Sequence, residues 1–434
     1  MPARAADDFA ERHLRWNVIA LGLDYGLFMV GLALMSTATI LPAFAESLGA
    51  SSVLIGAIPA VMTLGWFLPP LFAAAHTERL PYKLPFVLKW TGWERVPFLG
   101  LALIAFFLAE RAPRLSMWLV LAMLLVMTAF GGMLMPAWTD LVARVLPGRL
   151  RGRFFGFANV FGTLGGLAGS ALTAWALRTL PASTAYGVCF LAASVFVGLS
   201  WVALMVVREP PPTGEPAKAD FWTHLRGVPA LLRRDTNFRW YLVGRALMLC
   251  SVVGSGFFTV YALRVLSAPP ADVALYTALM LGGQIVGQLV LGWVGDHAGH
   301  RIVMVVAACA AAVMNVVALA AGTPHAFGAV FAVNGLFNAA LQVSVLNMVF
   351  DLAPTPAQNP TYVGIEKTFL APFGFALPLL GGLLVDAAGY PLVFGIGLAA
   401  SLACGAVLLV RVRDPRRSRY GAVPALRRSA EAPE

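Results

Sequence analysis

Twelve long apolar runs dominate this sequence, and one polar stretch divides them into six and six. Each run is long enough to cross a bilayer as a helix, which takes about 20 apolar residues. The runs are too long and too uniformly apolar for the alternating strands of a transmembrane barrel. We therefore expect an all-α integral membrane protein with spans at about 17–44, 53–75, 86–109, 116–138, 154–177, 185–207, 239–262, 273–295, 302–321, 326–350, 361–385 and 390–411.

The composition excludes a soluble protein. Hydrophobic residues make up 59% of the chain and charged residues only 12%, which is about half the charged share of a soluble domain. The formal net charge is +10. Basic loops facing anionic lipid account for that charge, because the aromatic residues lie inside the apolar runs rather than among the basic ones. We expect membrane lipid as a partner and no nucleic acid.

The polar stretch defines the expected domain organisation. A cytoplasmic N-terminal segment (1–16) precedes an N-terminal six-helix bundle (17–207), and a cytoplasmic central loop (208–238) precedes a C-terminal bundle (239–411) and a cytoplasmic tail (412–434). The central loop is either a linker with a short amphipathic segment or a plain loop. Lys and Arg concentrate on the side of the two termini, which predicts that this side is cytoplasmic. The preference for Arg over Lys and the many Ala and Gly residues suggest a bacterial cytoplasmic membrane.

The two sets of six spans resemble each other. Spans 4 and 10 both end in Asp-Leu, at Asp140 and Asp351, and spans 2 and 8 both lead into short loops that contain histidine, His76 and His297. These matches fit a parallel two-fold repeat, an arrangement that places a binding site between the halves.

Two loop sequences resemble those of a known family. The stretch Gly292–Arg301, which reads GWVGDHAGHR, is similar to the loop between spans 8 and 9 of the major facilitator superfamily, and Asp140–Gly156 is similar to its loop between spans 4 and 5. The resemblance covers essentially the whole chain and implies two pseudo-symmetric six-helix bundles that transport a solute. The loop at 75–81 departs from the family pattern because it lacks the expected Gly and Asp. Span 5 also lacks the Gly-Pro signature of drug:proton antiporters.

The resemblance also implies a gate at the cytoplasmic face. In that family, the acid at the position of Asp296 holds this face closed. We expect Asp296 to meet the start of span 5, because a helix N-terminus favours negative charge. The residues assigned to this gate are Asp296, His300, Arg301, Asp140, Arg151 and Arg153.

Two charged residues inside the spans lead the expected substrate and proton pathway. Asp24 lies on span 1 and Arg245 on span 7, and both spans line the central cavity in the family. An unpaired charge in the bilayer costs at least about 2.5–3.5 kcal/mol, so each needs a partner, water or a function. Either the two residues form a substrate or proton site across the halves, or they form a structural ion pair or latch between them.

The remaining intramembrane charges offer similar alternatives. Glu366 and Lys367 are adjacent on span 11 and should not pair with each other. Glu366 is a second proton-carrier candidate, and Lys367 is expected to meet Asp24 or substrate, unless both reach the interface by snorkelling. Glu94 and Arg95 on span 3 are also assigned to the pathway, with Glu94 as a further proton-carrier candidate. The alternative, which we favour, is that they pair with neighbouring helices, because they lie too deep to snorkel.

Amide side chains follow helical spacing on two further spans. Residues four apart lie on one helical face. They either line a cavity that binds polar solutes or hydrogen-bond between helices, and for span 10 we favour the cavity. The amides concerned are Asn334, Asn338 and Gln342 on span 10, and Gln284 and Gln288 on span 8.

The function classes narrow accordingly. No phosphate-binding loop, metal-ligand spacing or catalytic cluster is present, so we expect no enzyme, no metal and no cofactor. The sequence predicts a monomeric secondary transporter that moves a small polar or anionic solute by alternating access, coupled to protons. The alternatives are a facilitated-diffusion uniporter and a non-transporting membrane sensor or scaffold with the same fold.

Overall fold

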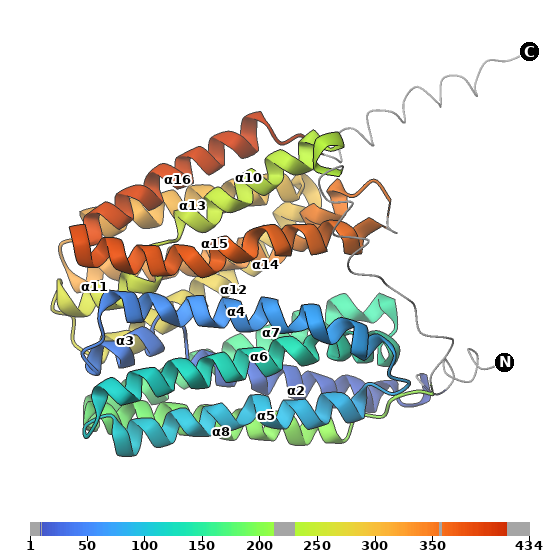
Figure 1. Cartoon of the computed structure of the whole chain (residues 1–434), viewed down its shortest axis with the longest axis horizontal. Helices are drawn as coiled ribbons and strands as arrows, with labels where there is room; N and C mark the ends of the chain where they lie inside the picture. The colour runs from blue at the N-terminus through green and yellow to red at the C-terminus, as the bar shows by residue number, and fades with distance from the viewer. Residues whose placement is uncertain (1–8, 10, 212–230, 356–357, 415–434) are drawn as a thin grey trace, which may run out of the picture.

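A computed structural model describes residues 9, 11–211, 231–355 and 358–414 (Figure 1). Every regular element in these residues is helical. Twelve of the helical segments are long and apolar enough to cross a membrane, which confirms the predicted all-α membrane fold. Most of the expected amphipathic segment of the central loop falls at 212–230, outside the described residues.

The first six spans form one bundle. Span 1 consists of α2 and α3, and the short π-helix η1 extends α5. The elements are α2 (Leu14–Leu34), α3 (Ile40–Ser47), α4 (Ser52–Glu78), α5 (Leu84–Leu103), η1 (Ile104–Leu108), α6 (Pro113–Val145), α7 (Gly148–Thr179) and α8 (Ala182–Met205).

The last six spans form the second bundle, which lies beside the first in Figure 1. Span 7 consists of α10, the 3-10 turn η2 and α11. The elements are α10 (Thr236–Ser251), η2 (Ser255–Phe257), α11 (Phe258–Arg264), α12 (Asp272–Ala298), α13 (His300–Ala320), α14 (Pro324–Leu352), α15 (Asn359–Ala388) and α16 (Tyr390–Val410).

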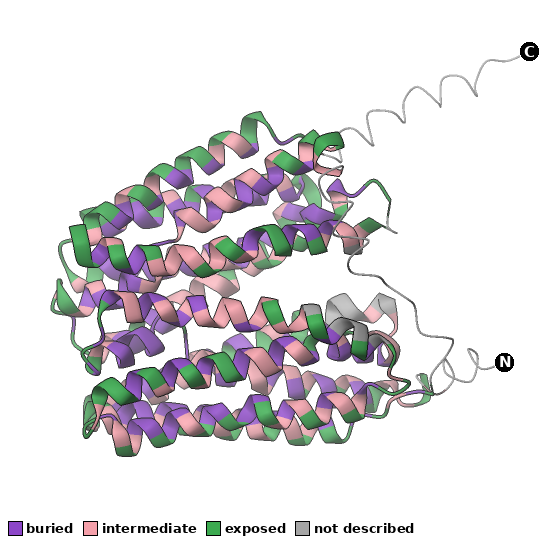
Figure 2. Ribbon diagram, viewed as in Figure 1, coloured by how far each residue is buried: buried purple, intermediate pink, exposed green. Residues whose placement is uncertain are grey.

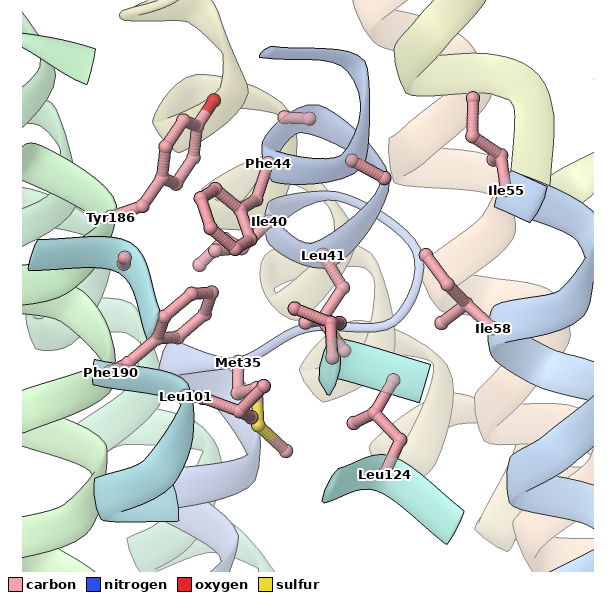
Figure 3. Packing of buried hydrophobic residues seen from close by; sticks show 14 of the residues in the cluster. Met35, Ile40, Leu41, Phe44, Ile55, Ile58, Leu101, Leu124, Tyr186 and Phe190 are labelled. Carbon is pink, nitrogen blue, oxygen red and sulfur yellow. The ribbon is translucent and has the colours of Figure 1, made fainter. Parts of the chain in front are cut away.

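Spans 1 and 7 are both broken, although the sequence predicted continuous helices there. Five residues separate α2 from α3, and a turn that contains Gly254 and Gly256 separates α10 from α11. The short helix α3 is held by the core of the first bundle, where Phe44 packs against Tyr186 and Phe190 (Figure 3). Irregular backbone at membrane depth is tolerated where protein surrounds it.

Two glycines allow the tight turns between consecutive helices of the second bundle. Gly299 joins α12 to α13 with a φ of 94°, and Gly389 joins α15 to α16 with a φ of 82°. Side chains rarely adopt this left-handed region, so glycine is favoured at both positions.

Buried and exposed residues alternate around the helices, as Figure 2 shows. Large apolar side chains such as Phe72, Trp118 and Val410 are exposed, as expected of surfaces that face lipid tails. The interior of the second bundle is one apolar cluster around Phe258 and Phe331. A cluster of the first bundle continues into the second at Phe257, Val260 and Val385, so the two bundles share a core at the end that carries α3 and α11.

Candidate functional site

The interface between the two bundles, which we call the seam, is closed at the end that carries α3 and α11. We call this the far end, and the opposite end, where α2 begins and α16 ends in Figure 1, the terminal end. Arg264 of α11 pairs with Glu46 of α3 and also donates to the Ala50 carbonyl at 2.7 Å. The hydroxyl groups of Thr39 and Thr277 lie 2.7 Å apart across the seam. These contacts join the two bundles at the far end.

Helices α4 and α15 run antiparallel along the seam, and their spacing changes along its length. At Gly382, an added Cβ would lie 2.6 Å from the Ser52 carbonyl oxygen, and at Gly374 it would lie 2.9 Å from Thr63 Cγ2. At Gly364, nearer the terminal end, it would meet nothing within 4 Å. The two helices therefore touch toward the far end, and there is open space beside Gly364.

A buried charged cluster lies inside the first bundle. Asp24 of α2 and Glu94 and Arg95 of α5 are each at most 9% exposed. Arg95 Nη1 lies 2.6 Å from Glu94 Oε2, and Arg95 Nη2 lies 3.7 Å from Asp24 Oδ1. Two carboxyl groups thus share one guanidinium group. We call these three residues the acid-rich triad.

The two acids of the triad have different surroundings. Asp24 accepts hydrogen bonds from Ser200 Oγ at 2.8 Å and from Trp138 Nε1 at 3.3 Å. Glu94 lies against Gly131 of α6, where an added Cβ would come 2.6 Å from Glu94 Oε1. The described contacts thus give Asp24 two neutral donors in addition to Arg95, and give Glu94 the guanidinium group. Donors that bond to a carboxylate stabilise its ionised form, and Asp24 has two donors that do not depend on Arg95.

The second bundle buries a balanced pair instead. Arg245 Nε of α10 donates to Glu366 Oε1 of α15 at 2.9 Å. Tyr241, one turn before Arg245, donates its hydroxyl group to the same oxygen at 3.1 Å. Both charged residues are buried. One cation therefore meets one anion, and we call Arg245 and Glu366 the balanced pair.

These contacts correct the predicted relation between spans 1 and 7. Asp24 and Arg245 do not form an ion pair or latch between the bundles, because each finds an opposite charge inside its own bundle. Glu366 does not snorkel, since it is buried against Arg245. The expectation that Glu94 and Arg95 pair with other helices is confirmed for Arg95, which reaches α2. Glu94 pairs with its own neighbour in sequence.

Lys367 faces the seam. It is exposed, and its Nζ lies 5.4 Å from the centre of the Phe67 ring on α4 of the other bundle. The described residues include no carboxylate paired with it. The predicted encounter with Asp24 is therefore wrong for this structure, because Asp24 is enclosed within the first bundle.

The amide residues largely bond within their own bundle. Asn338 Nδ2 donates to Asn334 Oδ1 at 2.9 Å, one turn earlier on α14. Gln288 Nε2 of α12 donates to Gln342 Oε1 of α14 at 2.9 Å. The second contact is a hydrogen bond between helices, which is the alternative to a solute-binding cavity at these amides. Gln284 lies half-buried on α12.

The residues assigned to the cytoplasmic gate lie at the terminal end. Buried His300 is near the Ser344 hydroxyl group, with Nδ1 and Oγ 3.3 Å apart. Arg301 donates to the last carbonyl groups of α16. Asp140 pairs with Arg144 at 3.0 Å and with Lys83 at 3.3 Å. These contacts stay within one bundle.

The predicted closing contact of Asp296 stays a prediction. Asp296 is exposed in the last turn of α12. The side chains of Arg151 and Arg153, near the start of α7, lie outside the described residues.

Sequence reasoning missed several residues that the structure brings into these sites. Ser200 and Trp138 complete the surroundings of Asp24, and Tyr241 completes those of Glu366. Glu46 and Arg264 close the far end, and they end the matching spans 1 and 7. The two-fold repeat was a signal that could have singled out this last pair.

Comparison with known proteins identifies the class and then the family. Twelve spans in two bundles that meet along a seam define a multi-pass membrane protein. The chain belongs to the Major Facilitator Superfamily, whose family model matches residues 23–268 and 255–432. It is a membrane transporter of that family.

Solved transporters share the fold at low sequence identity. A mutant form of the nucleoside transporter NupG matches with a TM-score of 0.71 at 12% identity, covering 91% of this chain and 100% of that one. A D-xylose-proton symporter matches with a TM-score of 0.67 at 13% identity, covering 92% and 98%. These similarities support the architecture and not a shared substrate.

One curated relative is more similar over a shorter stretch. The tetracenomycin C resistance and export protein of Streptomyces glaucescens is 31% identical over 154 residues, which is 36% of this chain and 28% of that protein. The match thus spans less than a third of the relative.

Proposed function

We propose that this protein is a proton-coupled secondary transporter of a small polar or anionic solute in a bacterial cytoplasmic membrane, with both termini in the cytoplasm. It works by alternating access, in which the two bundles rock about a site on the seam. The closed far end and the space beside Gly364 support a state that is open toward the cytoplasm.

The observation that carries proton coupling is the charge of the acid-rich triad. Two carboxylates and one guanidinium group leave one negative charge in excess when both acids are ionised. An uncompensated charge in a buried site is costly. Uptake of one proton removes this excess, so the triad is suited to bind and release a proton during the transport cycle.

Glu94 is the acid that we assign to this proton. Ser200 and Trp138 donate to Asp24, and these bonds favour the ionised form of Asp24. Glu94 depends on Arg95, which it shares with Asp24. Movement of α5 relative to α2 would change that sharing and so change the proton affinity of Glu94.

Reconstituted vesicles test this proposal. The purified protein is placed in liposomes with a pH-sensitive dye inside, and a panel of labelled polar and anionic solutes is supplied with and without a pH gradient. We expect at least one solute to accumulate with the gradient and to carry protons with it. The Glu94→Gln variant should still exchange that solute across the membrane but should no longer move protons.

Each alternative predicts a different result in the same vesicles. A uniporter would equilibrate the solute without accumulation and without proton movement, in the wild-type protein as in Glu94→Gln. A sensor or scaffold would move none of the panel at a rate above protein-free vesicles. Either result would contradict proton-coupled transport.

A further inference from the structure

We propose that Lys367 and Phe67 form an anchor for an organic anion that carries an aromatic ring. This proposal deepens the proposed function, on which it rests, because it names the solute class. The anchor joins the two bundles, since Lys367 belongs to α15 and Phe67 to α4.

The position of the anchor is the first argument. Toward the far end, Gly374 and Gly382 of α15 lie close against α4, whereas Gly364, one turn from Lys367 toward the terminal end, faces open space. Lys367 thus lies where the sealed part of the seam ends. It lies about 9 Å along the helix from the start of span 11 at a rise of 1.5 Å per residue. A solute entering from the terminal end meets Lys367 before the seam closes.

The charge of Lys367 is the second argument. Among the described residues, the membrane-embedded acids Asp24, Glu94 and Glu366 are engaged inside their own bundles. The contact given for Lys367 is the ring of Phe67, whose attraction for an exposed ammonium group is weak. An ionisable group without an ion partner is expected on a solute pathway when it lies on the seam between the bundles, as Lys367 does. A carboxylate or phenolate supplies the missing negative charge with a charge-assisted hydrogen bond.

The ring of Phe67 is the third argument, and it narrows the class of anion. When an anion binds the ammonium group, the half-buried Phe67 ring needs another partner. An aromatic body on the same solute packs against it in an offset or edge-to-face arrangement. A small hydrophilic anion satisfies Lys367 but leaves this apolar surface uncovered. An anion attached to a ring satisfies both residues.

Binding of 2-naphthoate to the purified full-length protein in nanodiscs tests the proposal, with cyclohexanecarboxylate and acetate as comparisons. We expect 2-naphthoate to bind about 3- to 10-fold more tightly than cyclohexanecarboxylate, and acetate to bind least. Lys367→Gln should weaken 2-naphthoate binding about 10-fold or more. The Lys367→Arg variant, which keeps the positive charge, should retain most of the wild-type affinity. Phe67→Leu should remove the preference for the aromatic anion and retain binding of cyclohexanecarboxylate.

Lys89 provides a matched control. It is also an exposed lysine inside a span, and its Nζ lies 5.1 Å from the centre of the Trp90 ring, but both residues belong to α5 and not to the seam. Lys89→Gln should bind 2-naphthoate as the wild type does. Equal weakening by Lys89→Gln and Lys367→Gln would show a nonspecific charge effect and overturn the proposal.

The remaining outcomes separate this inference from the proposed function. If wild-type protein shows no preference for 2-naphthoate, or Lys367→Gln binds it unchanged, the anchor is wrong even where vesicles show proton-coupled transport of another solute. If binding depends on Lys367 and Phe67 as expected but no proton moves in the vesicles, the anchor stands and proton coupling fails.

Discussion

The two bundles bury their charges differently, although their helices follow the same plan. The first holds two acids and one base, Asp24, Glu94 and Arg95, and the second holds one acid and one base, Glu366 and Arg245. A balanced pair satisfies its own charge and can act as a fixed structural contact. An unbalanced triad gains a neutral state when it takes up a proton. The difference suggests that the first bundle responds to protons and that the second supplies a constant scaffold.

Removal of either buried arginine should have the largest effect on stability, and the size of the loss should differ between the two bundles. Arg95→Met leaves two acids without a cation, whereas Arg245→Met leaves one. Breaking a buried pair costs about 3–5 kcal/mol, and we expect Arg95→Met to lose more stability than Arg245→Met. Thermal unfolding in detergent measures both losses. A smaller loss for Arg95→Met would remove the distinction between triad and pair.

Neutralising one acid in each bundle should destabilise the two bundles to different extents. Glu94→Gln leaves Asp24 with Arg95 as a balanced pair, so we expect a change in unfolding free energy of only about 1 kcal/mol. Glu366→Gln leaves Arg245 buried without a counter-charge and should cost about 3–5 kcal/mol. Both variants replace a buried glutamate with glutamine, so each is the control for the other. Equal losses in the two variants would mean that the triad is as balanced as the pair.

The far-end contact between the bundles should have a smaller effect, because its ion pair is partly exposed. Arg264→Gln removes the partner of Glu46 and should weaken the closed far end by about 0.2–1 kcal/mol. Spin labels on cysteines placed at Ser47 and Val265, with exposed Cys309 replaced by serine, report the distance across this end. We expect a larger fraction of molecules with a long distance.

Arg178 is the control for that experiment, since it is an exposed far-end arginine of α7. Arg178→Gln changes the same charge away from the contact between α3 and α11 and should leave the distance distribution unchanged. Identical distributions in Arg264→Gln and the wild type would show that the ion pair does not hold the far end closed.

The smallest effect should come from a neutral contact inside the second bundle. Gln288→Leu removes the hydrogen bond to Gln342, and such bonds between membrane helices contribute about 0.6 kcal/mol on average. We expect a slight fall in unfolding temperature and unchanged solute exchange in vesicles. Loss of exchange would instead place Gln288 on the solute pathway.

Several features could be predicted from the sequence because they depend on composition along the chain. Apolar runs of span length required membrane helices, and the polar stretch at 208–238 required a division into six and six. Asp24 and Arg245 stood out because any charge in an apolar run needs compensation. The family followed from the loop at Gly292–Arg301. None of these inferences required knowing how a helix is rotated.

Only the tertiary structure decided which charges meet. Glu94 and Arg95 are adjacent in sequence, as are Glu366 and Lys367, yet the first two pair and the second two do not. The reason is the orientation of each helix: α5 turns Glu94 and Arg95 into the bundle interior, whereas α15 turns Glu366 inward and Lys367 toward the seam. The sequence determined that these charges lie in the membrane, and packing determined that one bundle is balanced and the other is not. Packing depends on how each helix is rotated about its axis and on which helices lie beside it. The order of residues along the chain contains neither.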